Sequence, residues 1–251
     1  MEKTAFICIV ILLSCKIASA QWLSVPFAKE DAAGIKITEG WIYSQEEQRI
    51  HGYTDHKAVD FASRVGTKVY AAADGWAVYS FHSRLIPGRM WQGKAVGFGL
   101  GHFVQIWHSE QKRYTCYGHL SYVERHIPYL DPVQDSKQPH DFDPKAVYLP
   151  NGVIPKGALE VHRGDLIGYV GTSGLTWDYT EFPSSGPDDH QSWDEPHLHF
   201  EVYTRGADGK KDRWYDPFCL YSDAKEYNPE NPVSVAGLWL FDINHRLVWA
   251  K

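Results

Sequence analysis

Two histidines that stand two residues apart, His197 and His199, are the residues whose type and spacing first indicate chemistry. They lie in the segment 196–202, Pro-His-Leu-His-Phe-Glu-Val, where alternating polar and apolar residues predict a β-strand. Side chains two positions apart on a strand share a face, so both imidazoles would lie together while Leu198 and Phe200 face a core. Neutral imidazole is a common zinc ligand, and the pair therefore indicates a metal site that needs further ligands.

His56 and Asp60 form a second candidate pair. Because they stand four positions apart, both side chains would lie on one face of an extended strand, for which Val59 and Phe61 supply the apolar alternation. The alternative is an aspartate that is hydrogen-bonded to a surface histidine. Together with His199, the pair gives two imidazoles and one carboxylate. A catalytic zinc ion usually has three such protein ligands and leaves its fourth position to water.

Two further histidines, His119 and His197, complete the candidate set. A zinc ion would lower the pKa of its bound water to roughly 7. A nearby neutral histidine could then take the proton of that water, and a second histidine could donate a hydrogen bond to the developing oxyanion. The set therefore indicates a hydrolase.

The elements that must position these residues are short predicted strands separated by turns that contain glycine. No segment has a long apolar period of 3.6 residues, so we expect an all-β fold with an antiparallel sheet or sandwich. The expected elements are a strand at 35–43, a polar turn at 44–49, a hairpin at 66–79, a hairpin of 103–107 with 114–120, short strands on both sides of a Gly-Asp turn in 161–171, and a closing hairpin of 238–241 with 247–249.

Three long insertions, 82–100, 126–158 and 175–196, are expected to form loops between these strands. The third contains six carboxylates and no lysine or arginine. It could attract a cationic group of a substrate, such as the free amine of a diamino acid; the alternatives are a solvated loop and a weak calcium site.

The length of 251 residues fits one globular domain with insertions. We expect a lead-in segment at 21–34, a catalytic domain at 35–220 and a C-terminal extension at 221–251 that packs on the domain. The formal net charge of −6 gives no indication of a nucleic-acid partner.

The N-terminus has the features of an export signal. Lys3 precedes an apolar run at 5–13, and Ala18-Ser19-Ala20 provides a cleavage site, so 1–20 is predicted to be a signal peptide. Alternatively, the sequence before Cys15 resembles a bacterial lipobox, and membrane attachment is expected only if this cysteine is lipidated. Both readings predict a periplasmic or extracellular protein.

Two cysteines, Cys116 and Cys219, would remain after the signal is removed. They could form a disulfide in an oxidising compartment, or they could be two separate buried thiols.

The candidate residues fall into motifs whose order resembles that of the lysostaphin-type zinc metallopeptidases. The matching blocks are His-x-x-x-Asp at 56–60, Gly-Thr-x-Val-Tyr-Ala-Ala-Ala-Asp-Gly at 66–75, Tyr-x-His-Leu-Ser at 117–121, Gly-Asp-x-Ile-Gly-x-x-Gly-x-Ser-Gly at 164–174 and Pro-His-Leu-His-Phe-Glu at 196–201. The resemblance covers about residues 50–217.

This resemblance implies an antiparallel β fold with an open groove, the duplicated hybrid motif, and an endopeptidase that cleaves peptide cross-links of peptidoglycan. It implies that His56, Asp60 and His199 bind Zn²⁺. It further implies that His197 acts as the general base or orients the water, and that His119 stabilises the transition state.

Three features depart from the family pattern. Ala58 stands where the family usually has glycine, the insertions are long, and no wall-binding module or long propeptide is visible. The main alternative function is a non-catalytic zinc-holding module that binds wall peptides or regulates another wall hydrolase. Retention of all five candidate residues favours the enzyme, while the bond cleaved and the oligomeric state stay open.

Overall fold

A computed structural model describes most of the expected domain. The described residues are 22–91, 94–129, 152–154, 156–174, 196–221, 237–243 and 247–251. The predicted signal peptide, most of the insertion at 126–158 and almost all of the insertion at 175–196 therefore lie outside the described part of the chain.

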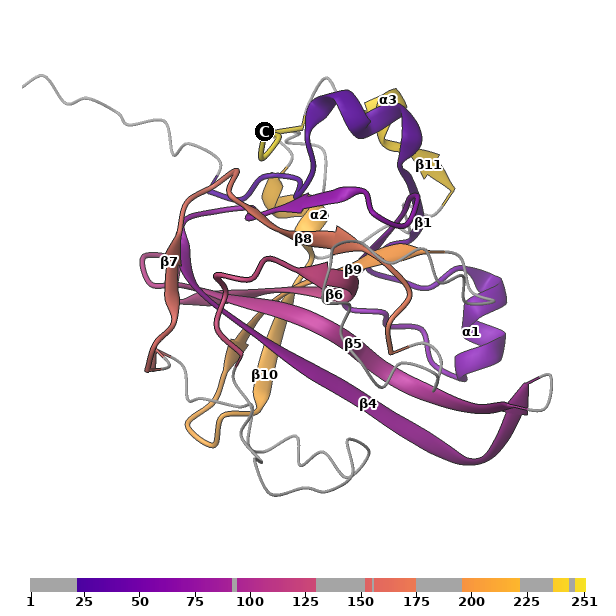
Figure 1. Cartoon of the computed structure of the whole chain (residues 1–251). Helices are drawn as coiled ribbons and strands as arrows, with labels where there is room; N and C mark the ends of the chain where they lie inside the picture. The colour runs from indigo at the N-terminus through magenta and orange to yellow at the C-terminus, as the bar shows by residue number, and fades with distance from the viewer. Residues whose placement is uncertain are drawn as a thin grey trace, which may run out of the picture.

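The described elements are predominantly β-strands, and Figure 1 shows them in the order of the chain. Their bounds are η1 (Lys29–Gly34, a 3-10 helix), β1 (Lys36–Glu39), α1 (Gln45–His51), β2 (Val59–Ala62), β3 (Lys68–Tyr70), β4 (Gly75–Trp91), β5 (Lys94–His108), β6 (Arg113–Val123), β7 (Leu159–Val161), β8 (Leu166–Val170), β9 (His197–Arg205), β10 (Lys211–Tyr215), α2 (Pro217–Tyr221), β11 (Leu238–Trp239) and α3 (Leu240–Ile243).

The named strands form one sheet in which neighbouring strands are antiparallel. The main order is β11-β1-β2-β9-β6-β5-β4-β7, while β10 pairs with β9, and β8 pairs with both β3 and β6. The expected all-β antiparallel fold is confirmed. The order places β9, which carries the His-x-His pair, in the interior of the sheet between β2 and β6.

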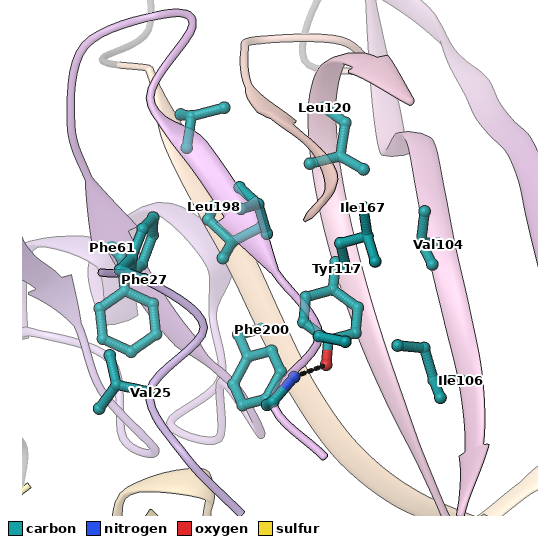
Figure 2. Packing of buried hydrophobic residues seen from close by; sticks show 14 of the residues in the cluster. Val25, Phe27, Phe61, Val104, Ile106, Tyr117, Leu120, Ile167, Leu198 and Phe200 are labelled. Atoms are coloured by element: carbon teal, nitrogen blue, oxygen red, sulfur yellow. Dashed lines mark hydrogen bonds between the residues drawn. The ribbon is translucent and has the colours of Figure 1, made fainter. Parts of the chain in front are cut away.

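The two faces of the central strands have different surroundings. Alternate side chains of β9, Leu198 and Phe200, enter the main apolar core, where Figure 2 shows them between Phe61 on one side and Tyr117 on the other. The Tyr117 hydroxyl accepts a hydrogen bond from the backbone N of Ala72 at 2.9 Å. The intervening residues of β9 therefore project to the opposite face, which carries the candidate site.

The lead-in segment is part of the core, which the sequence analysis did not predict. Leu23, Val25 and Phe27 are completely buried, and Val25 bridges to Trp249 near the C-terminus. These apolar residues alternate with others at a period of two, a signal that was available in the sequence.

The expected polar turn at 44–49 is wrong, because helix α1 occupies this segment. The Ser44 side chain accepts a hydrogen bond from the backbone N of Glu47, and Gly52 ends the helix in the left-handed conformation. Ser44 is thus the N-cap of the helix, while its own backbone N donates to the Glu39 carboxylate at 2.6 Å, so hydrogen bonding at the N-terminus explains why this polar segment is helical.

The expected hairpin at 66–79 is also wrong in its pairing. Both strands exist, but β3 pairs with β8, whereas β4 pairs with β5 and β7. The short strands expected on both sides of the Gly-Asp turn in 161–171 are present as β7 and β8, but they do not pair with each other. A turn signal predicts a reversal of the chain, but long-range contacts determine which strands pair.

The stretch 82–100, expected to be a loop, instead extends the hairpin of β4 and β5. The pairing continues to Trp91 opposite Lys94 and includes register shifts between His82 and Arg84 and between Leu85 and Met90. Bulges of this kind accommodate extra residues within a ladder, which explains why no regular alternation was visible. The expected hairpin of 103–107 with 114–120 is confirmed by the pairing of β5 with β6.

The expected closing hairpin of 238–241 with 247–249 is wrong. Strand β11 pairs with β1, the following residues form α3, and Trp249 bridges to Val25. Leu240 is completely buried in the main core, so this part of the extension does pack on the sheet.

Cys116 is a buried free thiol in the structure, and the side chain of Cys219 lies outside the described part. Within the described residues, no helix is long and apolar enough to cross a membrane.

Candidate metal centre

The pairing of β2 with β9 brings Asp60 opposite His199. These two residues are direct partners in the antiparallel ladder, and the His199 Nδ1 lies 2.9 Å from the Asp60 Oδ1. On the other side of His199 its ladder partner is Gly118 of β6. A Cβ at position 118 would lie 3.4 Å from the His199 Cβ and 3.1 Å from the Leu100 side chain, so glycine leaves room for the imidazole.

His56 reaches the same place from a loop. The sequence analysis placed it on a strand with Asp60, but β2 begins only at Val59, and Lys57 has a left-handed backbone with φ of 64°. The His56 Nδ1 lies 2.9 Å from the Gly40 carbonyl oxygen. Since a carbonyl can only accept, this contact makes Nδ1 the donor and leaves the lone pair of Nε2 directed at the cluster.

The three candidate ligand groups form a compact set. The His56 Nε2 lies 3.2 Å from the Asp60 Oδ2 and 3.3 Å from the His199 Nδ1, and all three ligand atoms lie within 4.8 Å of one another. Ligands at about 2.0–2.1 Å from a tetrahedral zinc ion are about 3.4 Å apart, so the spacing fits such an ion. His56 and Asp60 are buried, while His199 is partly exposed, as an accessible centre requires.

The cluster is strongly coupled electrostatically. Burial alone would raise the pKa of Asp60, but the imidazoles of His56, His197 and His199 hold it well below its usual value. Burial alone would lower the pKa of His199, but the carboxylates of Asp60 and Glu201 raise it to about 9. The site therefore favours positive charge between its carboxylates, and a divalent cation would compete with the proton on His199.

His119 enters the site through a β-bulge. Val104 of β5 pairs with Tyr117, and His102 pairs with Leu120, so β6 has one more residue than β5 across this interval. His119 has a φ of 59°, which is uncommon for a residue other than glycine. The ring centroid of His119 lies 4.7 Å from that of His197 and 5.7 Å from that of His199, so the bulge directs this side chain toward the cluster.

The turn after β8 determines the tautomer of His119. Its Nδ1 lies 2.8 Å from the Ser173 carbonyl oxygen, so Nδ1 is the donor and a neutral ring has its lone pair on Nε2. Burial, followed by the neighbouring histidines, holds the pKa of His119 well below its usual value. The Ser173 hydroxyl donates to the Leu120 carbonyl at 2.7 Å, which holds the turn against β6. Gly101 permits this approach, since a Cβ there would lie 2.2 Å from the Ser173 backbone.

His197 completes the group. Its Nε2 lies 3.9 Å from the Asp60 Oδ2, and its ring lies beside that of His119. The structure thus brings together all five residues that the sequence analysis selected. Their individual roles stay predictions.

A carboxylate that the sequence analysis did not assign lies behind His199. The Glu201 Oε1 is 3.3 Å from the His199 Nε2, and the other oxygen of Glu201 accepts from the half-buried ammonium group of Lys211 on β10. The alternation in β9 could have indicated Glu201, because it lies two positions beyond His199. Lys211 could not be found this way, since β10 meets β9 only through the pairing.

We expect Glu201→Gln to weaken zinc affinity by about tenfold to a hundredfold, because carboxylates that orient a ligating histidine typically contribute this much. Competition with a chromogenic chelator would measure the affinity. Glu160→Gln on β7, an exposed and distant site, is the control. Equal affinity of both variants and the parent would contradict the orienting role of Glu201.

Comparison with known proteins gave matches only among solved structures. No family model matches the chain, and no curated protein matches it. The antimicrobial peptidase lysostaphin from Staphylococcus simulans is 17% identical with a TM-score of 0.37; the match covers 78% of this chain and 52% of that one. Csd3 of Helicobacter pylori is 17% identical with a TM-score of 0.40, over 80% of this chain and 33% of that one. The catalytic domain of the prophage-encoded M23 protein EnpA from Enterococcus faecalis is 17% identical with a TM-score of 0.40, and the match covers 79% of this chain and 97% of that one.

The chain thus spans about half the length of lysostaphin and a third of Csd3. At TM-scores this low, the similarities support no statement about individual residues, and the interpretation of the site rests on its geometry.

Proposed function

We propose that this chain is an exported zinc-dependent endopeptidase that hydrolyses peptide bonds in peptidoglycan stem peptides or cross-bridges. The observation that supports it is the convergence of a His56, Asp60 and His199 cluster with two further histidines on one face of the sheet. The substrate class comes from the motif resemblance, and export comes from the predicted signal peptide.

The donor set fits a zinc ion. His56 would offer Nε2 and His199 would offer Nδ1, since their other ring nitrogens face the Gly40 carbonyl and Glu201, while Asp60 would offer a carboxylate oxygen. Bound there, zinc would supply Lewis acidity and a water of lowered pKa.

His119 and His197 divide the proton chemistry. Because its Nδ1 donates to the Ser173 carbonyl, a neutral His119 presents a lone pair on Nε2 and can accept a proton but not donate one there. Proton acceptance therefore suits His119, and donation to the developing oxyanion suits His197. This is the reverse of the roles that the family resemblance implies. The tautomer of His119 supports its role as acceptor, and donation is then left to His197, the other histidine beside the cluster.

Hydrolysis of purified peptidoglycan would test the proposal. The mature chain, loaded with zinc, is expected to release new amino termini from a wall suspension, to lose this activity with a chelator and to regain it with added zinc. If the zinc-loaded chain binds wall material but releases no amino termini, the non-catalytic wall-binding module is the correct function.

A further inference from the structure

A pocket of about 400 Å³ opens beside the metal cluster. It shares His56 and Glu201 with the site, and its other walls come from the loop before β2 and from β10. The lining residues are Tyr53, Thr54, Asp55, His56, Lys57, Glu201 and Trp214. A peptide whose scissile bond lay at the cluster would therefore place a neighbouring group in this pocket.

The two carboxylates that line the pocket are poorly placed to interact with a charged group of a substrate. The Glu201 carboxylate is buried and is already held by Lys211 and His199. Asp55 is exposed and accepts from the Thr54 hydroxyl at 3.2 Å, so water screens its charge. These two carboxylates therefore contribute little attraction or repulsion within the pocket.

Lys57 is the available cation. Its ammonium nitrogen lies 4.7 Å from the ring centroid of Trp214, and among the described residues no carboxylate pairs with it. A cation over an indole keeps its capacity to donate hydrogen bonds to an anion from its outer side. The Trp214 ring also offers an apolar surface next to the charge.

The backbone places Lys57 rigidly with respect to the cluster. It directly follows His56, and both backbone N–H groups donate to the Trp41 carbonyl, at 3.0 Å from His56 and 3.2 Å from Lys57. The left-handed conformation of Lys57, with φ of 64°, turns the chain between His56 and β2. The backbone of Lys57 is thus held directly beside a candidate zinc ligand, and the contact with the Trp214 ring positions its ammonium group.

We infer that this pocket binds a carboxylate-bearing part of the substrate next to the scissile bond. Lys57 recognises the carboxylate, and Trp214 packs against the aliphatic part of the same substrate group. The inference rests on the proposed function and narrows it. Stem peptides with a free carboxylate beside the cross-link fit this pocket, whereas uncharged glycine bridges do not use its cation.

The test compares one cross-linked stem-peptide dimer in two forms, with the carboxyl groups beside the cross-link either free or converted to carboxamides. The variants are Lys57→Gln, which removes the charge, and Lys57→Arg, which keeps it. Lys112→Gln is the matched control, because Lys112 is an exposed lysine that is also left-handed, with φ of 53°, in the turn between β5 and β6. Zinc content verifies that each variant retains the site.

We expect kcat/KM of the parent to favour the free carboxylate about tenfold or more. Lys57→Gln should lose this preference, while Lys57→Arg and Lys112→Gln should keep it. An undiminished preference in Lys57→Gln, or hydrolysis of both forms at equal rates by the parent, would overturn the inference.

Calorimetric binding of the same two peptides separates this result from failure of the proposed function. If the parent hydrolyses neither form but binds the carboxylate form more tightly, and Lys57→Gln does not, the pocket assignment holds and the enzymatic function is wrong. Equal binding of both forms by a parent that hydrolyses neither would overturn the pocket assignment as well.

Discussion

Replacing His199 by alanine should abolish both zinc binding and hydrolysis. The substitution removes one of three ligand groups, and with it the imidazole that lies between the carboxylates of Asp60 and Glu201 at 2.9 and 3.3 Å. Two remaining ligands would leave more than one coordination position to solvent, and the affinity for zinc would fall accordingly. Zinc content after dialysis, measured by atomic emission, and release of amino termini from peptidoglycan would report the two effects.

His162→Ala is the control for this prediction. His162 is an exposed histidine whose Nδ1 lies 3.8 Å from Asp74, far along the chain from every member of the cluster. The His162→Ala variant should bind one zinc ion per chain and retain full activity. Stoichiometric zinc in the His199→Ala variant would contradict the assignment of the metal centre.

Replacing His119 by alanine should leave zinc bound while kcat falls about 10²–10⁴-fold, the usual contribution of a general acid or base. His119 contacts the ligand His199 only through ring packing at 5.7 Å, so its loss removes no ligand. Because a neutral His119 must accept the proton, the acidic limb of the pH–rate profile should be lost together with the rate. Single-turnover rates from about pH 4 to pH 8 would measure both. The range extends below the usual titration range of histidine, because burial and the neighbouring histidines lower the pKa of His119.

His126→Ala, which removes an exposed histidine after β6, is the control and should preserve the rate and its pH profile. Loss of zinc from the His119 variant to the same extent as from the His199 variant would mean that His119 is a ligand. A full rate with an unchanged acidic limb would exclude it from proton transfer.

Periodicity in the sequence was sufficient for the fold class and for much of the cluster. Alternation in 196–202 correctly placed His197 and His199 on one face and Leu198 and Phe200 in the core. Alternation in β2 likewise separates Asp60 from Val59 and Phe61, which are buried in the core. These results follow from the two-residue repeat of a strand, a property that each segment carries by itself.

Alternation alone would place His119 on the wrong side of its strand. Counted from Tyr117, whose ring lies in the main core, a regular strand would also direct His119 into the core. The bulge turns the His119 side chain to the opposite face, toward the cluster. It forms where β6 changes its partner from β9 at Gly118 to β8 at Leu120. A change of partner depends on segments about fifty and eighty residues away, so no local pattern contains it.

Residue types and spacing by themselves determined that this chain forms an antiparallel β structure and that one of its strands carries a histidine pair. The tertiary structure decided which groups converge on that pair. It set Asp60 directly opposite His199, turned Lys57 left-handed so that His56 could reach the cluster, and aligned the carbonyls of Gly40 and Ser173 that select the imidazole tautomers. The reason is physical: side-chain alternation is a local consequence of backbone geometry, whereas register, bulges and carbonyl contacts depend on which distant strands pair.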